Sequence, residues 1–230
     1  MVFILDHLNS MIAAFGVILI LGMAQIGAQR SALEQTTSYA TKTKALSFGE
    51  WMEDDILSIG ANFGRNRYRF DPPEQDAYDN TERFTFFSDS VTVSADTLRT
   101  MTRYKLFYLR SVERGGDEIR LYEVRRRLAR VPVNNGTATP PPDDAVVFGG
   151  EPGPDAWTED GRSLATLSGF RIRLVERTGQ ETTDPERADF IQVEYRLIPE
   201  FPIEPEYLRE LYYTTTLKVR PFWDPPPQAI

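Results

Sequence analysis

The first thirty residues contain a long apolar segment without a charged side chain. The segment runs from Leu8 to Gln29, reads LNSMIAAFGVILILGMAQIGAQ, and is 22 residues long. As an α-helix rising about 1.5 Å per residue it would measure about 33 Å, which is enough to cross the hydrocarbon core of a bilayer. The sequence therefore predicts a hydrophobic transmembrane or filament-core helix over residues 1–29.

A secretory signal peptide is the alternative interpretation of this segment. Signal peptides carry positive residues before a short apolar core of about 7–15 residues and end in small residues that permit cleavage. Here Asp6 is the first charged residue, and no Lys or Arg precedes Arg30. Small residues are present, but they also let helices approach one another closely. A retained helix is favoured, and its small residues are Ala13, Ala14, Gly16, Gly22 and Ala24.

The charges that flank the segment leave its orientation open. No Lys or Arg lies before it, whereas Arg30, Lys42 and Lys44 follow it. A simple count of these positive charges would keep the following residues on the inner side of a membrane. Long domains are nevertheless often translocated regardless of such a small bias, so the count does not decide the orientation.

Composition narrows the function classes. The 230-residue chain has a formal net charge of −8, which argues against a nucleic-acid partner because such partners need basic surfaces. It contains no cysteine, so disulfides and thiolate chemistry are excluded. Its only histidine is His7, beside the apolar segment, which removes a histidine-based triad or metal site from the rest of the chain. We therefore predict a protein that is not an enzyme and that uses no cofactor and no metal.

Residues 30–64 are predicted to continue the helix as an amphipathic segment. No proline occurs between Met1 and Phe70, and the Asn62–Gly64 cluster is typical of a helix end. A solvated linker over residues 30–45, where Ser and Thr are frequent, is the alternative. Apolar side chains recur on one side at helical spacing; they are Leu33, Tyr39, Leu46, Trp51, Met52, Ile56 and Ile59.

Residues 65–220 are predicted to form a β-rich globular head. Arg83–Ser88 is a strand candidate, and Arg114–Asp117 is a hairpin signal between two further candidates. Downstream, apolar and polar residues alternate, as in antiparallel strands with one buried face. The amphipathic half of the helix is the natural cover for that face, which predicts an α+β fold in which the long helix packs on an antiparallel sheet. The side chains expected to be buried against Met52, Ile56 and Ile59 are Phe170, Ile172, Leu174, Ile191, Val193, Tyr195, Leu217 and Val219.

Two segments are rich in proline. Residues 131–162 also contain several glycines, which predicts a surface excursion of the head and not a second domain. Residues 221–230 are predicted to be a stiff, extended Pro-rich tail, which either docks on a neighbouring subunit or is a frayed terminus.

Carboxylates gather within and beside the first of these segments. They can be read as calcium ligands or as a solvated acidic loop, and the loop is favoured because their spacing matches no EF-hand. They are Asp143, Asp144, Glu151, Asp155, Glu159 and Asp160.

An apolar N-terminal helix that becomes amphipathic and then leads into an antiparallel sheet resembles a type IV pilin or a type II secretion pseudopilin. The likeness is greatest to the larger minor pilins, in which the helix often ends as leucine-x-x-aspartate-x-x-x-x-glycine-aromatic-x-glycine. The segment Trp51–Gly64, WMEDDILSIGANFG, is similar in character. The family's precursors carry a short basic leader that ends in glycine, and Met1–Leu5 does not match it. Asp6 stands about where the family has a glutamate.

The resemblance implies a structural subunit of a cell-surface or periplasmic filament that assembles through its N-terminal helix. Its partners would be copies of itself or homologous pilin-like subunits, and membrane lipid before assembly. It would lie in the inner membrane as a single-pass protein with its head outside the cytoplasm, or in the filament. The alternative is a single-pass accessory or docking subunit of a large membrane complex. The candidate assembly residues are Asp6, Ala13, Gly16 and Gly22.

Asp6 has two possible roles. A carboxylate within an apolar bundle is costly unless it is paired, so Asp6 would pair there with the N-terminal ammonium of a neighbour and favour insertion in register. At the headgroup surface, it would instead cap the start of the helix.

Overall fold

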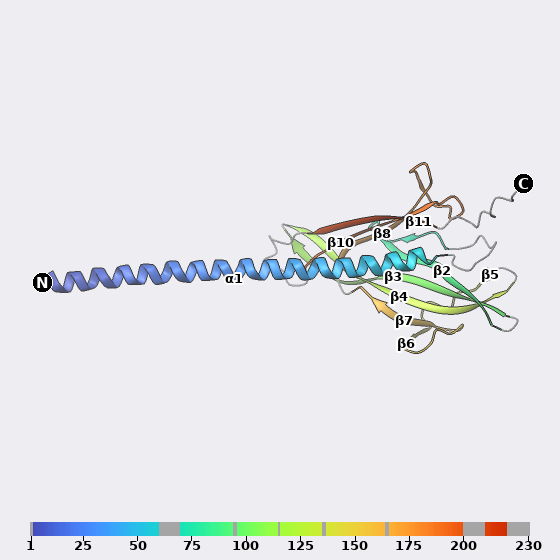
Figure 1. Cartoon of the computed structure of the whole chain (residues 1–230), viewed down its shortest axis with the longest axis horizontal. Coiled ribbons are helices and arrows are strands. Elements are labelled where there is room, and N and C mark those ends of the chain that lie inside the picture. The colour runs from blue at the N-terminus through green and yellow to red at the C-terminus, as the bar shows by residue number, and fades with distance from the viewer. Residues whose placement is uncertain are drawn as a thin grey trace, which may run out of the picture.

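The computed structural model describes residues 2–59, 70–93, 96–114, 116–134, 137–163, 166–199 and 210–219. Within these residues the chain forms one long helix, α1 (Val2–Leu57), and a twisted sheet that packs along the second half of that helix. Figure 1 shows the first half of α1 projecting well beyond the sheet. The architecture is α+β, with a long N-terminal helix on an antiparallel sheet, as predicted.

Helix α1 is continuous over 56 residues. Neither Gly22 nor Gly27 interrupts it, and no proline is present to remove a hydrogen bond from its interior. At its end, the hydroxyl of Ser58 donates a 2.6 Å hydrogen bond to the carbonyl oxygen of Asp55. The prediction of a single helix from about residue 5 to about residue 60 is confirmed, and the alternative of a linker over residues 30–45 is wrong. Residues 60–64, the predicted helix end, lie outside the described residues.

The sheet is antiparallel along its main path, β1-β2-β3-β4-β8-β10-β11, and the additional pair β6–β7 is parallel. Strand β7 also pairs with β4, β5 pairs with β4, and β9 pairs with β8. The strands are β1 (Glu74–Gln75), β2 (Thr81–Val93), β3 (Asp96–Arg114), β4 (Asp117–Asn134), β5 (Thr137–Ala138), β6 (Val146–Phe148), β7 (Trp157–Arg162), β8 (Leu167–Val175), β9 (Glu181–Thr182), β10 (Phe190–Leu197) and β11 (Leu211–Lys218).

The predicted strand signals are confirmed. Arg83–Ser88 lies within β2, and the hairpin signal joins β3 to β4 with Arg114 opposite Asp117. In β8 and β10, odd and even positions alternate between buried and less buried, and Ile191 pairs with Leu174 in the core-facing row. The register therefore places the expected residues on the inner face.

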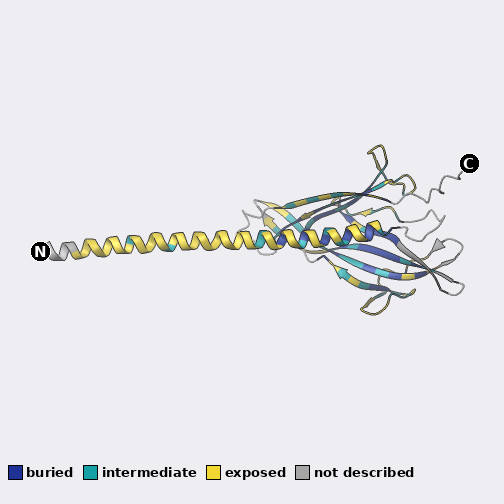
Figure 2. Cartoon of the chain, viewed as in Figure 1, coloured by how far each residue is buried: buried dark blue, intermediate teal, exposed yellow. Residues whose placement is uncertain are grey.

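The main core lies between this inner face and the second half of α1 (Figure 2). Every side chain that was predicted to be buried against Met52, Ile56 and Ile59 belongs to it. Tyr195 fixes the approach of the helix, because its hydroxyl donates a 3.0 Å hydrogen bond to the carbonyl oxygen of Ala45. The close contact requires glycine at position 49, since a Cβ there would lie 2.6 Å from the Tyr195 hydroxyl oxygen.

The prediction of a surface excursion over residues 131–162 needs correction. Strand β4 continues to Asn134, and the end of the segment returns as β7, which pairs with β4. Trp157, at the start of β7, is fully buried with Phe87 and Met101 in a smaller core on the outer face of the sheet. The burial of this one aromatic side chain therefore holds the proline-rich segment against the sheet, although the segment has no alternating sequence pattern. The predicted tail, residues 221–230, lies outside the described residues.

Candidate functional site

The first half of α1 is the most unusual surface of the molecule. Its large apolar side chains are exposed from Leu8 onward, and none of its most apolar stretch is buried within the chain (Figure 2). Within the described residues, α1 is the one helix long and apolar enough to cross a membrane. A single N-terminal helix of this kind is compatible with a single-pass membrane anchor.

The predicted assembly residues all lie on this half of α1, but not on one side of it. Asp6 is helical, and its side chain lies outside the described part of the structure. Ala13 and Gly16 are one turn apart, whereas Gly22 is nine residues from Ala13 and so lies about 180° round the helix. A Cβ added at Gly16 or Gly22 would meet nothing within 4 Å. Both glycines are therefore open to a second helix.

A stripe of small residues follows the side of α1 that Ala13 and Gly16 share. Its residues lie within about 80° of the helix circumference at 100° per residue, and Ile20 is the one large residue that interrupts them within this arc. The signal for this stripe is present in the sequence as spacings of three, four and eight residues, and Gly22 lies on the opposite side of the helix. The stripe consists of Ala13, Gly16, Ala24, Gly27 and Ser31.

A buried polar cluster joins the end of α1 to the sheet. The hydroxyl of Tyr104 donates a 2.6 Å hydrogen bond to Oδ2 of Asp55, and Arg126 Nη2 lies 2.7 Å from Oδ1 of the same carboxylate. Arg126 Nη1 lies 3.1 Å from Oδ2 of Asp160 on β7. Burial raises the pKa of Asp55, although the Tyr104 hydrogen bond and the Arg126 charge act in the opposite direction. The Asp55 carboxylate thus joins the helix to β3 and β4, and the Arg126 guanidinium extends the cluster to β7.

The outer face of β3 and β4 carries a block of positive charge. Arg103 lies opposite Arg127, and Lys105 lies opposite Arg125. Like charges in directly opposed positions are unfavourable. Phe107 reduces this cost, because the guanidiniums of Arg125 and Arg127 lie 4.4 Å and 5.3 Å from the centroid of its ring.

Carboxylates of the proline-rich segment neutralise this block. Asp143 forms ion pairs with Arg83, Arg103 and Lys105. Glu159 lies 3.5 Å from Arg125 Nη1. The predicted solvated acidic loop is therefore wrong for Glu159 and Asp160, which lie in β7 and are paired with cations of the sheet. Asp143 is exposed, as predicted, but it is also paired. The charge pattern of β3 and β4 was visible in the sequence, but only the register shows which cations share a face.

Replacing Asp143 with asparagine should destabilise the head by about 1 kcal/mol, because the buried Arg103 guanidinium loses the charge of a carboxylate that is itself 43% exposed and so partly screened by solvent. Burial raises the pKa of Asp143, but the charges of Arg103, Lys105 and Arg83 outweigh it, so the pKa lies below the ordinary value of 3.8. Such a carboxylate stabilises the folded state above its unfolded pKa, and this contribution is lost as the pH falls through the folded pKa. The difference between wild type and variant should therefore shrink in acid below about pH 4. Denaturant unfolding of both proteins over a pH series measures this, and a constant difference would contradict it.

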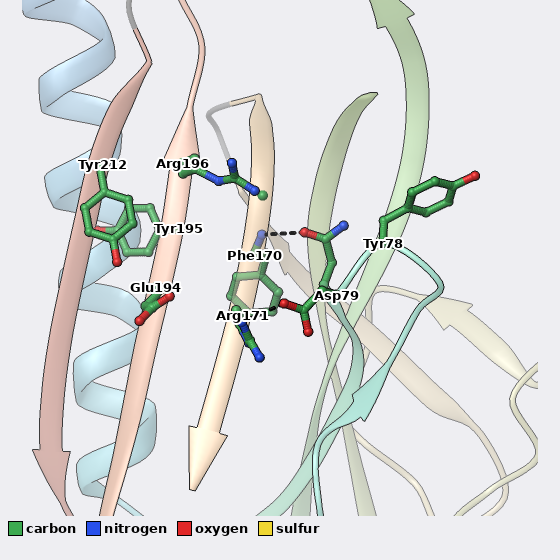
Figure 3. Close-up of a pocket in the computed structure, with 10 residues that line it drawn as sticks. Tyr78, Asp79, Phe170, Arg171, Glu194, Tyr195, Arg196 and Tyr212 are labelled. Atoms are coloured by element: carbon green, nitrogen blue, oxygen red, sulfur yellow. Dashed lines mark hydrogen bonds and ion pairs between the residues drawn. The ribbon is translucent and has the colours of Figure 1, made fainter. Parts of the chain in front are cut away.

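A polar hollow of about 200 Å³ opens between the ends of β8, β10 and β11 and the turn before β2 (Figure 3). Arg171 faces Asp79 across it at 2.6 Å, and Asn80 Oδ1 accepts a hydrogen bond from the backbone N–H of Phe170. Glu194 is paired with Arg173. Because both carboxylates are already paired with arginines of the same chain, we assign no ligand to this hollow.

Within the described ranges, no three His, Cys, Asp or Glu side chains gather in a way that would hold a metal ion. Comparison of the chain with protein-family models, with curated proteins and with solved structures finds no match in any of the three.

Proposed function

We propose that this chain is a structural, pilin-like or pseudopilin-like subunit of a cell-surface or periplasmic filament. Before assembly, the N-terminal half of its helix lies in the inner membrane, with the head outside the cytoplasm. In the filament, it packs against the same helix of other subunits. The partners are copies of this chain or homologous subunits.

One observation carries the proposal: α1 runs without a break from a wholly exposed apolar half into the main core of the head. A lipid anchor alone needs no rigid connection to the domain that it holds, and a flexible linker would serve it. A subunit that is positioned by its helix in an ordered assembly does need that connection, because the orientation of the head then follows from the packing of the helix. The stripe of small residues supports this reading, since small residues permit close helix–helix contact.

The test is incorporation into assemblies. Gly16→Leu and Gly22→Leu should each lower the amount of subunit in sheared or purified filaments relative to the amount in membranes, because leucine blocks close approach. Asp6→Ala should have the same effect by removing the partner of a neighbouring N-terminal ammonium. All three should leave the head folded, since the positions of both glycines are clear of the head. The measurement is immunoblotting of the two fractions, with protease resistance of the head as the folding check.

Conservative variants provide matched controls. Gly16→Ala keeps a small side chain, and Asp6→Glu keeps the acid, so both should assemble at nearly wild-type levels. If Gly16→Leu, Gly22→Leu and Asp6→Ala all assemble as well as wild type, the filament proposal fails. A single-pass accessory subunit of a membrane complex would then be the better account.

A further inference from the structure

An apolar hollow of about 320 Å³ lies where the flank of α1 meets the end of β7. Phe48 and Trp51 give it an aromatic lining, and Gly161 of β7 lies so close that an added Cβ would be 3.1 Å from the Trp51 ring. Two cationic residues flank it, Lys44 on the helix and Arg162 on the strand. The hollow therefore suits an apolar side chain that has negative charge around it.

The same chain presents such a side chain on its own surface. Phe148, the last residue of β6, is 77% exposed, more than any other large hydrophobic residue in the described part of the chain. Gly149 and Gly150 follow it with φ of 78° and 91°, a conformation that other residues rarely adopt. The segment around Phe148 is acidic, and its exposed carboxylates are Asp144, Glu151 and Asp155.

We propose that the hollow at Trp51 receives Phe148 from a second copy of this chain. Aromatic anchors that fill a pocket on the partner are the usual centres of protein interfaces. The charge of Arg162 agrees with this assignment, because Arg162 would face the acidic segment that carries Phe148. Charge complementarity of this kind selects the partner and the register of the contact.

The positions of the two elements define the kind of assembly. Phe148 lies opposite Glu159 in the parallel β6–β7 pair, three residues before Arg162 at the end of β7. The anchor and the hollow are therefore displaced along β7 by about 10 Å at 3.3 Å per residue. Figure 1 shows β6 at the rim of the head, farther from the N-terminus of α1 than the end of β7.

This displacement favours a staggered contact. The inference rests on the proposed function in one respect, namely that neighbouring helices run parallel. A two-fold axis parallel to the helix does not change the position of a residue along that axis. Phe148 of one copy and the hollow of the other would therefore stay about 10 Å apart along the axis, so one copy must shift along it to bring Phe148 to the hollow. Such a contact is head-to-tail and leaves a free anchor and a free hollow at the two ends, so that it can continue.

The chain has no cysteine, which permits a clean cross-linking test in the full-length protein in membranes. Ser47→Cys marks the hollow, and Val147→Cys marks the segment of the anchor while Phe148 is kept. With a short bis-maleimide cross-linker, the double-cysteine chain should give a ladder of dimers, trimers and larger species. A mixture of the two single-cysteine chains should stop at dimers, because each contact uses up both cysteines. Ser47→Cys combined with Tyr212→Cys, an exposed residue on β11, is the matched control and should give no ladder.

Two further changes in the double-cysteine chain test the chemistry. Phe148→Ala and Arg162→Glu should each reduce the ladder roughly tenfold or more, as expected for the loss of an interface anchor or of its charge partner. Phe148→Leu keeps an apolar anchor and should retain most of the ladder. Because the two cysteines of one chain lie close enough for a link within that chain, the mixture of single-cysteine chains is decisive. A mixture that gives no dimer, or a ladder that Phe148→Ala leaves unchanged, overturns the inference.

The two proposals fail differently. If the mixture of single-cysteine chains gives no dimer while subunits still enter filaments, the Phe148 contact is wrong and the filament function stands. If the ladder forms while Gly16→Leu, Gly22→Leu and Asp6→Ala leave assembly intact, the contact stands and assembly through the apolar half of α1 is wrong.

Discussion

Replacing Arg126 with methionine should lower the free energy of unfolding of the head by about 3 kcal/mol at neutral pH, the lower end of the range for a broken buried ion pair. The variant keeps a side chain of similar length but leaves the Asp55 carboxylate, which is 9% exposed, with the Tyr104 hydroxyl as its remaining partner. Arg126 itself is 23% exposed, which is why we expect the lower end. Urea unfolding followed by tryptophan fluorescence measures the difference.

The pH dependence of this loss has a definite sign. Burial already raises the pKa of Asp55 above its ordinary value, and Arg126 holds it down. Without Arg126 the folded-state pKa rises further. A group with a raised folded pKa favours the folded state when protonated, and this contribution is lost as the pH rises through that pKa. The difference between wild type and variant should therefore be smaller near about pH 5 than near about pH 8.

Arg125→Met is the matched control for Arg126→Met. Arg125 is the preceding residue of β4 and faces the outer side of the sheet, where it pairs with Glu123 and Glu159. Its side chain is 30% exposed and its two carboxylate partners retain solvent contact, so we expect a loss of about 1 kcal/mol or less. Equal losses for the two variants would contradict a special role for the Asp55 cluster.

Replacing Trp157 with alanine should cost roughly 3–5 kcal/mol, the range for removing a large aromatic side chain from a core. The ring is fully buried, and the guanidinium of Arg103 lies 4.1 Å from its centroid. Its Nε1 donates a 3.0 Å hydrogen bond to the carbonyl oxygen of Pro141. The variant therefore loses the small core on the outer face and the attachment of the proline-rich segment at once.

Hydrogen exchange locates the effect of Trp157→Ala. Amides of β6 and β7 should lose protection more than those of β8 and β10, which belong to the main core. Trp157→Phe keeps a ring in the cavity but removes the hydrogen bond to Pro141, and should cost about 1–2 kcal/mol. A uniform loss of protection over the whole head would show that the small core does not open separately.

The parts of the fold that could be predicted from the sequence are those in which apolar residues recur at regular helix or strand spacing. The alternation at Ile191, Val193 and Tyr195 predicts the buried face of β10. The spacing of Met52 and Ile56 predicts the covering face near the end of α1, although Leu33, Tyr39 and Leu46, which were predicted for the same side, are exposed. Each of these patterns involves residues only a few positions apart in the chain, so it can be recognised in a single sequence.

The parts that the sequence did not predict depend on pairing over long distances. Arg125, Arg126 and Arg127 look equivalent as a row of three, yet only Arg126 points inward, because β4 places it opposite the buried Tyr104. Trp157 lies in a segment rich in proline and glycine, where the sequence shows no strand pattern although β7 forms there. The ion pairs of Asp143 could not be predicted, because they depend on which strands lie next to one another, and no local sequence pattern records that.

The continuous helix also has a mechanical consequence. The buried residues of α1 extend from Thr41 to Ile56, about 22 Å along the helix axis, and the strands run roughly in the same direction (Figure 1). A pull on the N-terminal end thus loads this whole contact in shear, so that its side chains share the force instead of separating one after another. The Asp55 cluster, near the far end of the contact, resists the same sliding movement. Tension applied through the helix is thereby spread over the entire core of the head.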